Sequence, residues 1–449
     1  MNRKTWRDRD LAVLWHPCTQ MQEHLDGAPL ITIRRGQGVW LEDYEGRRYL
    51  DAVSSWWTNL FGHAEPRIAA AIASQAQQLE QVILAGFSHV PAIELAEQLL
   101  ALAPSGLSKV FFADNGSAAV EVALKMSYHA HLNRGDTQRT RFIALQNSYH
   151  GETLGALAVT DIPLYRRTYA PLMMQPGFVP SPDAWLAEPG ESAEDRAERA
   201  AQALAEVLQR QGEQTAALII EPLVQCAAGM RMHSPLYLRR ARELCDRHGV
   251  HLIADEIAVG FGRTGSLFAC EQAGISPDLM CVSKGITGGF LPLAATLATE
   301  AIYQAFLSDR RDRAFLHSHS YTGNPLACAA ALASLQIFRD QDVLGANRQR
   351  AAALARAAAP MAELPKVGEV RQRGMIVAFE LVADRANKTP LPTVGRYGQQ
   401  IYRAGLERGV LLRPLGDVIY WMPPYCISED EIGHLGKVTQ DALRVAFSA

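Results

Sequence analysis

The sequence has few cysteines, little net charge and no long apolar run. Its seven cysteines are odd in number, lie scattered along 449 residues, and never form a Cys-X-X-Cys pair. This pattern argues against a disulfide framework or a zinc site and favours a reducing compartment. The formal net charge is only -3, and like charges do not gather in long blocks. We therefore expect neither a nucleic acid nor a membrane surface as a partner.

Segments that could carry the chain into or across a membrane are also missing. The first eight residues are charged but lead into no continuous apolar stretch, which argues against an export signal. We expect a cytoplasmic protein. With 48% apolar residues, a chain of this length can bury a large core and divide it between two lobes.

Between about residues 109 and 300, short apolar runs alternate with helical patterns. Such alternation is typical of βαβ units that build a mostly parallel sheet. In the helical stretch 117–131, Val120, Leu124 and Tyr128 fall on one face. The expected strands are residues 109–113, 141–146, 217–221, 251–255, 279–283 and 293–298. We therefore predict an α/β fold with a wound central sheet.

The two ends of the chain are expected to form a smaller α+β lobe. After Asn324-Pro325 come a long Ala-rich helix, a strand near 375–380 and a final helix-strand-helix pattern. Near the N-terminus, strand-like runs flank a turn at 43–46. The predicted parts are an N-terminal segment (1–65) that packs with the small domain, a large domain (66–325) and a C-terminal small domain (326–449).

Two neighbouring apolar strands end in groups that suit carbonyl chemistry. One run ends in Asp255 and the next leads into Lys284, and open α/β sheets bind ligands at the carboxyl ends of their strands. An amine there can form an imine with the aldehyde of pyridoxal 5'-phosphate, while a buried carboxylate keeps the pyridine nitrogen protonated. Each residue alone fits a turn or a solvated surface group. Together they predict a pyridoxal-phosphate site with Lys284 and Asp255 as catalytic residues.

A phosphate group is expected where the strand 109–113 runs into the next helix. Gly116 allows close approach of the backbone to an anion, and Ser117 can cap the helix and offer its hydroxyl. An ordinary helix cap, without a ligand, would show the same residues.

An aromatic residue follows a third strand end, in residues 147–151 (Asn-Ser-Tyr-His-Gly). Tyr149 can stack on one face of the pyridine ring, with Ile257 against the opposite face. His150 fits a core histidine better than a catalytic base, because Lys284 becomes a free amine when substrate displaces it.

The order of these motifs resembles that of the class III aminotransferases over nearly the whole chain. The resemblance is carried by Gly116-Ser117, 149–151, Glu221-Pro222, Asp255-Glu256, Lys284-Gly285 and 322–325 (Thr-Gly-Asn-Pro). It implies a fold type I transferase that binds pyridoxal 5'-phosphate, with Tyr149 among its catalytic residues. It also implies a homodimer with active sites at the subunit interface, where a loop of the partner completes the phosphate site. That loop would contribute His319 and Ser320 to the cofactor and Ser318 to the substrate.

Within the family, residues 15–17, 54–57, 255–265 and 412–416 resemble a branch that works in biotin biosynthesis. That branch transfers an amino group from S-adenosylmethionine to 8-amino-7-oxononanoate by a ping-pong route through pyridoxamine phosphate. The acceptor is a long apolar chain with a carboxylate, which Arg413 can grip. The other residues implied to contact substrate are Trp56, Trp57, Tyr149, Glu152, Lys284, Tyr420 and Cys18.

Two departures from that branch leave the amino donor open. Cys18 stands where the best-known members carry tyrosine, and residues 318–320 (Ser-His-Ser) replace Gly-Pro-Thr. The segments 319–324 and 285–289 are similar to members that use lysine as donor. An ω-amino acid:pyruvate aminotransferase would share every cofactor residue. A non-catalytic pyridoxal-binding regulator is a remote alternative, since such a chain would ordinarily add a DNA-binding module or lose the lysine.

Overall fold

The apolar runs in the middle of the chain form one seven-stranded sheet in the computed structural model, which describes residues 5–448. The strand order is β4-β12-β11-β10-β7-β5-β6, with β12 antiparallel to both neighbours and the other pairs parallel. Their bounds are β4 (Leu107–Ala113), β5 (Arg141–Leu145), β6 (Gly177–Val179), β7 (Thr215–Ile220), β10 (His251–Asp255), β11 (Leu279–Val282) and β12 (Ala294–Thr299). All six expected strands are present, and the predicted mostly parallel sheet is confirmed.

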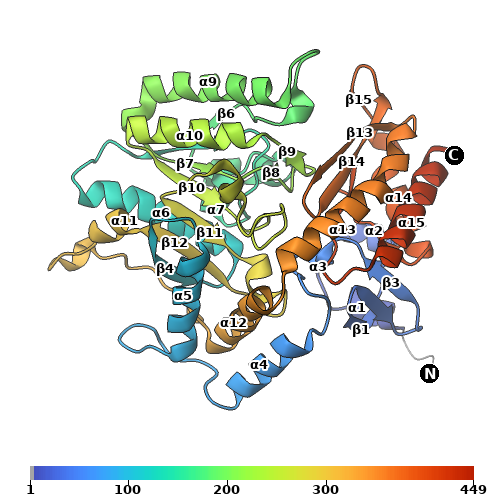
Figure 1. Ribbon diagram of the computed structural model, residues 1–449, viewed down its shortest axis with the longest axis horizontal. Helices are drawn as coiled ribbons and strands as arrows, with labels where there is room; N and C mark the ends of the chain where they lie inside the picture. Colours follow the sequence, from blue (N-terminus) through green and yellow to red (C-terminus); the bar gives the residue numbers. More distant parts are fainter. Residues whose placement is uncertain (1–4, 449) are drawn as a thin grey trace.

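Helices cover both faces of this sheet, because its strand residues alternate between two apolar cores. Leu252 lies in a core with the helices α9 (Ala193–Gln211) and α10 (Pro235–His248). Its neighbour Ile253 lies in the opposite core, with α6 (Gly116–Asn133). Figure 1 shows α9 and α10 side by side above the sheet. The buried sheet is thus a rigid platform that presents its strand ends to one edge.

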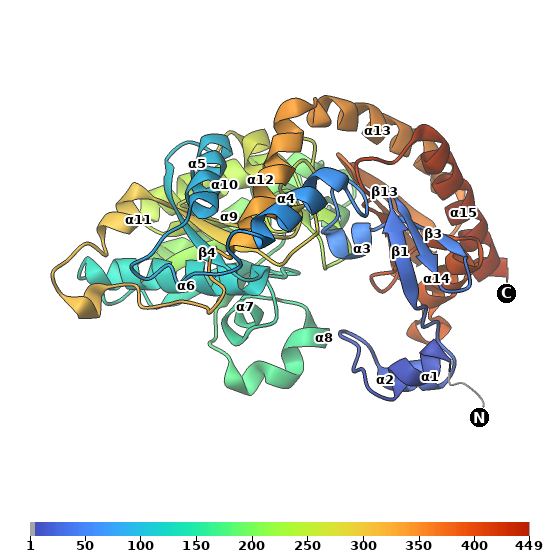
Figure 2. The same ribbon diagram turned by 90° about the horizontal axis from the view of Figure 1, so that it is seen from below.

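The remaining helices of the large lobe lie around the edges of the sheet and at its junction with the small lobe (Figures 1 and 2). They are α4 (Pro66–Ala76), α5 (Val90–Leu102), α7 (Leu154–Ala158), α8 (Pro163–Arg166), α11 (Glu300–Gln304) and α12 (Pro325–Asp340). A small hairpin of β8 (Val224–Gln225) and β9 (Arg231–Met232) points toward the small lobe.

Both ends of the chain build the smaller lobe, at the right of Figure 1. Strand β3 (Arg48–Asp51), near the N-terminus, pairs in parallel with β16 (Val410–Leu411), near the C-terminus. The other strands are β1 (Ile33–Gln37), β2 (Trp40–Asp43), β13 (Val367–Arg373), β14 (Ile376–Asp384), β15 (Thr389–Pro390) and β17 (Val418–Trp421). The helices are α13 (Val343–Ala358), α14 (Tyr397–Glu407) and α15 (Glu429–Ser448). The expected α+β domain from both termini is confirmed.

Two short N-terminal helices, α1 (Trp6–Leu11) and α2 (Met21–Leu25), lie below the small lobe in Figure 2. The segment between them approaches α8 of the large lobe in that view. It carries Cys18, whose Sγ is 3.8 Å from Oε1 of Glu152. The N-terminal segment therefore contacts the large lobe.

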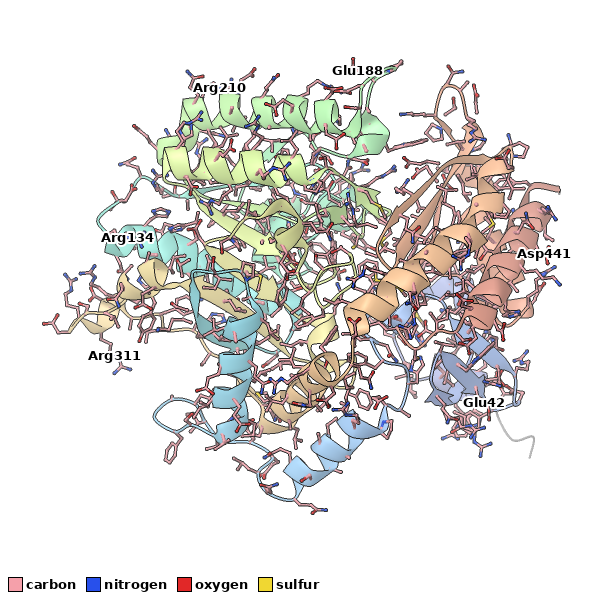
Figure 3. The ribbon with its side chains drawn as sticks, in the orientation of Figure 1. Glu42, Arg134, Glu188, Arg210, Arg311 and Asp441 are labelled. Atoms are coloured by element: carbon pink, nitrogen blue, oxygen red, sulfur yellow. The ribbon has the colours of Figure 1, made fainter. Side chains whose placement is uncertain are left out.

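Charged side chains of both signs surround the two lobes, as expected from the small net charge. Figure 3 labels six of them at the outer edge of the molecule: Glu42, Arg134, Glu188, Arg210, Arg311 and Asp441. Across residues 5–448, no helix combines the length and the apolar character that a membrane span requires.

Candidate active site

A cavity of about 190 Å³ lies at the carboxyl ends of the parallel strands. Segments that follow five different strands, β4, β5, β7, β10 and β11, contribute to its walls. The lining residues are Trp57, Asn115, Gly116, Ser117, Tyr149, His150, Gly151, Glu221, Asp255, Ile257, Ala258, Val259, Ser283 and Lys284. The fold thus gathers most of the residues that the sequence predicted for the cofactor.

Asp255 ends β10 and is held by two hydrogen bonds. Its Oδ1 accepts the backbone N–H of Ile257 at 3.1 Å, and its Oδ2 lies 2.7 Å from Nδ1 of His150. Both side chains are buried, and Nε2 of His150 has no hydrogen-bond partner among the described residues. The histidine expected in the core therefore orients the carboxylate at the floor of the cavity.

Lys284 follows β11 and has an unusual backbone conformation, with φ of 46°. Such a conformation is uncommon for a residue with a side chain and recurs at functional sites. Its Nζ lies 4.7 Å from the ring centroid of Trp57. Burial lowers the pKa of this amine, while the nearby Cys226, Asp255 and Glu221 act in the opposite direction. The lowered pKa increases the share of the neutral amine, which is the nucleophilic form.

Glu221 is a cavity residue to which sequence reasoning gave no role. Its carboxylate accepts the backbone N–H of Tyr149 at 2.9 Å and that of Cys226 at 3.0 Å. Burial, followed by the charge of Asp255, raises the pKa of Glu221 to about 8. Its position directly after a fully buried strand is the signal that could have identified it.

The start of α6 forms a cradle that suits an anion. Asn115 caps the helix by accepting the N–H of Ala118 at 3.0 Å, so the capping role expected of Ser117 falls to Asn115 instead. The Oγ of Ser117 accepts the N–H of Glu152 at 3.1 Å and lines the cavity. A Cβ on Gly116 would lie 3.1 Å from Ile257, so glycine leaves this wall open. The cradle and the carboxylate of Asp255 together fit a phosphate-bearing pyridine cofactor.

Two adjacent tryptophans extend from this cavity toward the small lobe. Trp57 is buried, and its Nε1 donates to the hydroxyl of Tyr420 at 2.9 Å. Tyr420 is buried behind Trp57, so it supports the wall of the cavity and does not line it. Trp56 is 38% exposed, and the Cζ of Arg413 lies 4.0 Å from its ring centroid. Trp57 therefore lies next to Lys284, and Trp56 lies next to Arg413.

A second hollow, of about 540 Å³, lies beside the first. Cys18 and Glu152 line it together with Tyr165 and Tyr169. The Oε1 of Glu152 accepts a hydrogen bond from the hydroxyl of Tyr149 at 2.9 Å, so a residue of the second hollow is linked to one of the first. Burial raises the pKa of the Cys18 thiol, and the Glu152 carboxylate raises it further.

The loop 318–320 lies near the start of α6 but outside the cavity, with Nδ1 of His319 3.8 Å from Oδ2 of Asp114. Ser318 and Ser320 are exposed, and His319 contacts His317, with 3.2 Å between their Nε2 atoms. None of the three is among the described residues that line the cavity. Within one chain, this loop therefore does not line the predicted cofactor site.

The fold and the cavity are those of a transaminase. A family model for aminotransferase class III matches residues 21–443. The chain belongs to the class III aminotransferases, which are pyridoxal-phosphate-dependent enzymes of fold type I.

Several relatives carry one name, adenosylmethionine-8-amino-7-oxononanoate aminotransferase. The relative from Nitratidesulfovibrio vulgaris is 46% identical, over 97% of this chain and 81% of its own length. The relative from Helicobacter pylori is 45% identical over 94% of both chains. A crystal structure under the same name, from Methanocaldococcus jannaschii, superposes with a TM-score of 0.92 at 37% identity, covering 98% of this chain and 99% of that one.

An omega transaminase of Pseudomonas jessenii, solved in complex with PMP, is also similar. It superposes with a TM-score of 0.93 at 30% identity, and the match covers 99% of both chains. The fold is therefore shared by enzymes with different substrates, and the specific reaction has to be argued from the pocket.

Proposed function

We propose that this chain transfers an amino group from S-adenosylmethionine to 8-amino-7-oxononanoate and so forms 7,8-diaminononanoate in biotin biosynthesis. The observation that carries the proposal is the pair Trp56-Trp57, which contacts Lys284 on one side and Arg413 on the other. The acceptor has the matching order of groups: a ketone, an aliphatic chain and a terminal carboxylate. The relatives named adenosylmethionine-8-amino-7-oxononanoate aminotransferase, at 46% and 45% identity, support the same reaction.

When bound, pyridoxal 5'-phosphate supplies an aldehyde that can hold the amino group and a ring that accepts electrons. Ser117 and the start of α6 hold the phosphate, and Tyr149 and Ile257 enclose the ring. Asp255 keeps a proton at the ring nitrogen, and His150 orients its carboxylate. Lys284 holds the cofactor between turnovers, and its freed Nζ moves the proton at the α-carbon of the donor.

Arg413 binds the carboxylate of the acceptor, and the faces of Trp56 and Trp57 line its aliphatic chain. Tyr420 supports Trp57 from behind. Cys18 and Glu152 belong to the second hollow, and the Glu152 carboxylate offers an anionic partner for a cationic donor. This arrangement gives the acceptor and the donor separate sets of contacts.

The enzyme acts as a homodimer in this proposal, with His319 and Ser320 completing the phosphate site of the partner and Ser318 contacting substrate there. The loop 318–320 lies beside the segment 79–87, because Nε2 of Gln81 donates to the carbonyl of Ser320 at 2.9 Å. Large apolar side chains are exposed in the segment 79–87 (Ile83 and Phe87) and on either side of the loop 318–320 (Leu316 and Tyr321). A second copy that covers them would bury this apolar surface. A cytoplasmic location is part of the proposal, because seven scattered cysteines without a Cys-X-X-Cys pair suit a reducing compartment.

A donor screen tests the proposed reaction. Purified, cofactor-loaded enzyme is incubated with 8-amino-7-oxononanoate and either S-adenosylmethionine, lysine or alanine, and the diamine is detected by mass spectrometry. We expect the diamine with S-adenosylmethionine. Formation with lysine alone would keep the acceptor but change the donor.

Absence of the diamine with every donor would overturn the proposed acceptor. Turnover of β-alanine with pyruvate would then favour an omega transaminase, the kind of enzyme among the similar structures. The Lys284→Ala variant is the control, because it should abolish turnover with any pair of substrates.

A further inference from the structure

Trp56 and Trp57 belong to a turn whose backbone conformation is unfavourable for the residues that form it. Ser54, Ser55 and Trp57 have φ values of 51°, 59° and 66°, in the left-handed region that side-chain-bearing residues rarely adopt. The turn is the short helix α3 (Ser54–Trp57), in which Ser55 and Trp56 have non-helical backbone angles. A strained backbone persists where surrounding groups hold it in place.

Asp51, just before the turn, accepts three of the hydrogen bonds that hold it. It lies at the end of β3 and is completely buried. Its Oδ1 accepts the N–H of Val53 at 3.2 Å, while its Oδ2 accepts the N–H and the hydroxyl of Ser55 at 2.6 and 3.0 Å. Outside the turn, the Oδ2 of Asp51 lies 3.0 Å from Nε2 of His63.

The neighbours of His63 determine which ring nitrogen carries the proton. The Oδ1 of Asn59 accepts the N–H of Gly62 at 2.8 Å, which sets the orientation of the amide. The amide nitrogen then donates to Nδ1 of His63 at 3.1 Å, so Nδ1 is an acceptor and Nε2 carries the proton toward Asp51. A Cβ on Gly36 would lie 2.7 Å from the Cβ of His63, so the residue is closely packed against β1.

The result of this chain of hydrogen bonds is the placement of two aromatic rings. The ring centroid of Trp57 lies 4.7 Å from Nζ of Lys284, and that of Trp56 lies 4.0 Å from Cζ of Arg413. Neither Asp51 nor His63 lines the cavity. Their effect on the site therefore passes through the backbone of the turn.

We propose that Asp51 and His63 are positioning residues that hold the strained turn so that Trp57 faces Lys284 and Trp56 faces Arg413. The inference rests on the proposed function for the roles of Lys284 and Arg413, but the placement of the rings does not depend on the substrate. Removing the hydrogen bonds lets the turn relax and moves both rings away from their partners.

Fluorine NMR of the cofactor-loaded enzyme, labelled with 5-fluorotryptophan, tests the placement of the rings. The chain has seven tryptophans, and Trp56→Phe and Trp57→Phe assign the two resonances of interest. We expect Asp51→Asn to shift these two resonances and leave the other resonances in place.

A matched control exists in the same N-terminal sheet. Asp43 is also completely buried and also holds a turn, accepting the backbone N–H groups of Glu45 and Arg47 and the hydroxyl of Tyr49. Asp43→Asn should lower thermal stability and leave the Trp56 and Trp57 resonances unchanged.

Kinetics give a second, independent readout. Displacing positioned groups by about 1 Å can cost about 100-fold, and we expect a loss of that order in kcat/KM for 8-amino-7-oxononanoate in Asp51→Asn. His63→Gln, which can still donate to Asp51, should retain more of this activity than His63→Leu. Should Asp51→Asn fail to fold, the two His63 variants carry the test.

The proposal is wrong if Asp51→Asn and His63→Leu lower only the melting temperature, with the two resonances and the KM of the acceptor unchanged. Failure of the proposed function would look different. The wild-type enzyme would then form no diamine, and the resonances would still report whether Asp51 holds the turn.

Discussion

At the scale of single residues, two adjacent carboxylates at the end of β10 have different surroundings. Asp255 faces the cavity and contacts His150. Glu256 is completely buried, and its carboxylate accepts the N–H groups of Ala269 and Cys270 at 2.9 and 2.8 Å. Burial raises the pKa of Glu256 to about 7. The alternation of side chains at the strand end therefore separates a functional acid from a structural one.

Replacing each carboxylate by its amide should separate these roles. Asp255→Asn removes the charge that holds a proton at the ring nitrogen, and we expect kcat to fall about 100-fold, a usual cost of losing one preorganised electrostatic group. Glu256→Gln, measured beside it, should change the melting temperature and leave kcat near that of the wild type. Equal losses of kcat in the two variants would contradict the assignment of Asp255.

Arg413 offers a test of substrate binding by shape as well as charge. Lysine keeps the positive charge but loses the planar fork that binds a carboxylate and stacks on an aromatic ring. We expect Arg413→Lys to raise the KM of the keto acid at least about 10-fold, equivalent to about 1.4 kcal/mol, with a smaller effect on the donor half-reaction. Arg396→Lys, at an exposed arginine paired with Glu23, is the control. An unchanged KM in Arg413→Lys would remove Arg413 from the acceptor site.

At the scale of elements, α6 and β10 meet through two stacked histidines. His131 of α6 and His251 of β10 have ring centroids 4.1 Å apart. Burial, followed by the repulsion that a protonated His131 would exert, lowers the pKa of His251 to about 2. Burial also lowers the pKa of His131. Both histidines are therefore neutral in the folded state near neutral pH, whereas in the unfolded chain they bind protons below pH about 6.5.

This pair should make the fold sensitive to acid. Because the folded pKa is lowered, the stability is fully present above pH about 6.5 and is lost as the pH falls below it, by up to about 1.4 kcal/mol per pH unit for each histidine. We expect His251→Asn to flatten the fall of the melting temperature between pH 6.5 and 4.5. His434→Asn, at an exposed histidine, should follow the wild-type curve. A variant curve parallel to that of the wild type would contradict this account.

Strands were predictable from the sequence where an apolar run of four or more residues lies between turns. The six expected runs are short, apolar and bounded by turns, so the expected and observed strands agree closely. β6 has only three residues, too few for a periodic pattern. The kinked turn at 54–57 could not be predicted either, because its conformation depends on Asp51 and on the carbonyl of Met422, which accepts from Ser54.

At the scale of the whole molecule, a buried ion cluster joins the two lobes. Glu380 of the small lobe accepts a hydrogen bond from Nη2 of Arg231, in the β8-β9 hairpin, at 3.0 Å and one from Arg371 at 2.8 Å. Its Oε2 also forms an ion pair with Nη1 of Arg231 at 3.0 Å. Arg371 also donates to the carbonyl of Met230 in the large lobe at 2.8 Å. The cluster fixes the small lobe, and with it Arg413, against the strand ends of the large sheet.

Breaking this cluster should destabilise the junction of the lobes. Glu380→Gln leaves two arginines without their shared charge, and we expect it to lower the free energy of unfolding by about 3 kcal/mol, the usual cost of breaking a buried pair. The measurement is the midpoint of urea unfolding. Glu198→Gln removes a carboxylate from an exposed pair with Arg240 and should leave the midpoint unchanged. Similar midpoints for the two variants would show that the cluster does not stabilise the junction.

The sequence by itself determined the sheet, the family and the two central groups, Asp255 and Lys284, because strand ends and reactive residue types can be read locally. It gave no role to Glu221, and it treated His150 as an ordinary core residue. Both roles depend on contacts between segments that are distant in the chain, Glu221 with Tyr149 and Cys226, and His150 with Asp255.

Only the tertiary structure decided how the tryptophans are used. Trp56 and Trp57 are neighbours in the sequence, but one faces an arginine of the small lobe and the other a lysine of the large lobe. That division follows from a strained turn held by buried hydrogen bonds, which no local preference of Ser54 or Ser55 would produce. A sequence pattern records which residue types are present, whereas long-range burial and hydrogen bonding determine where their side chains point.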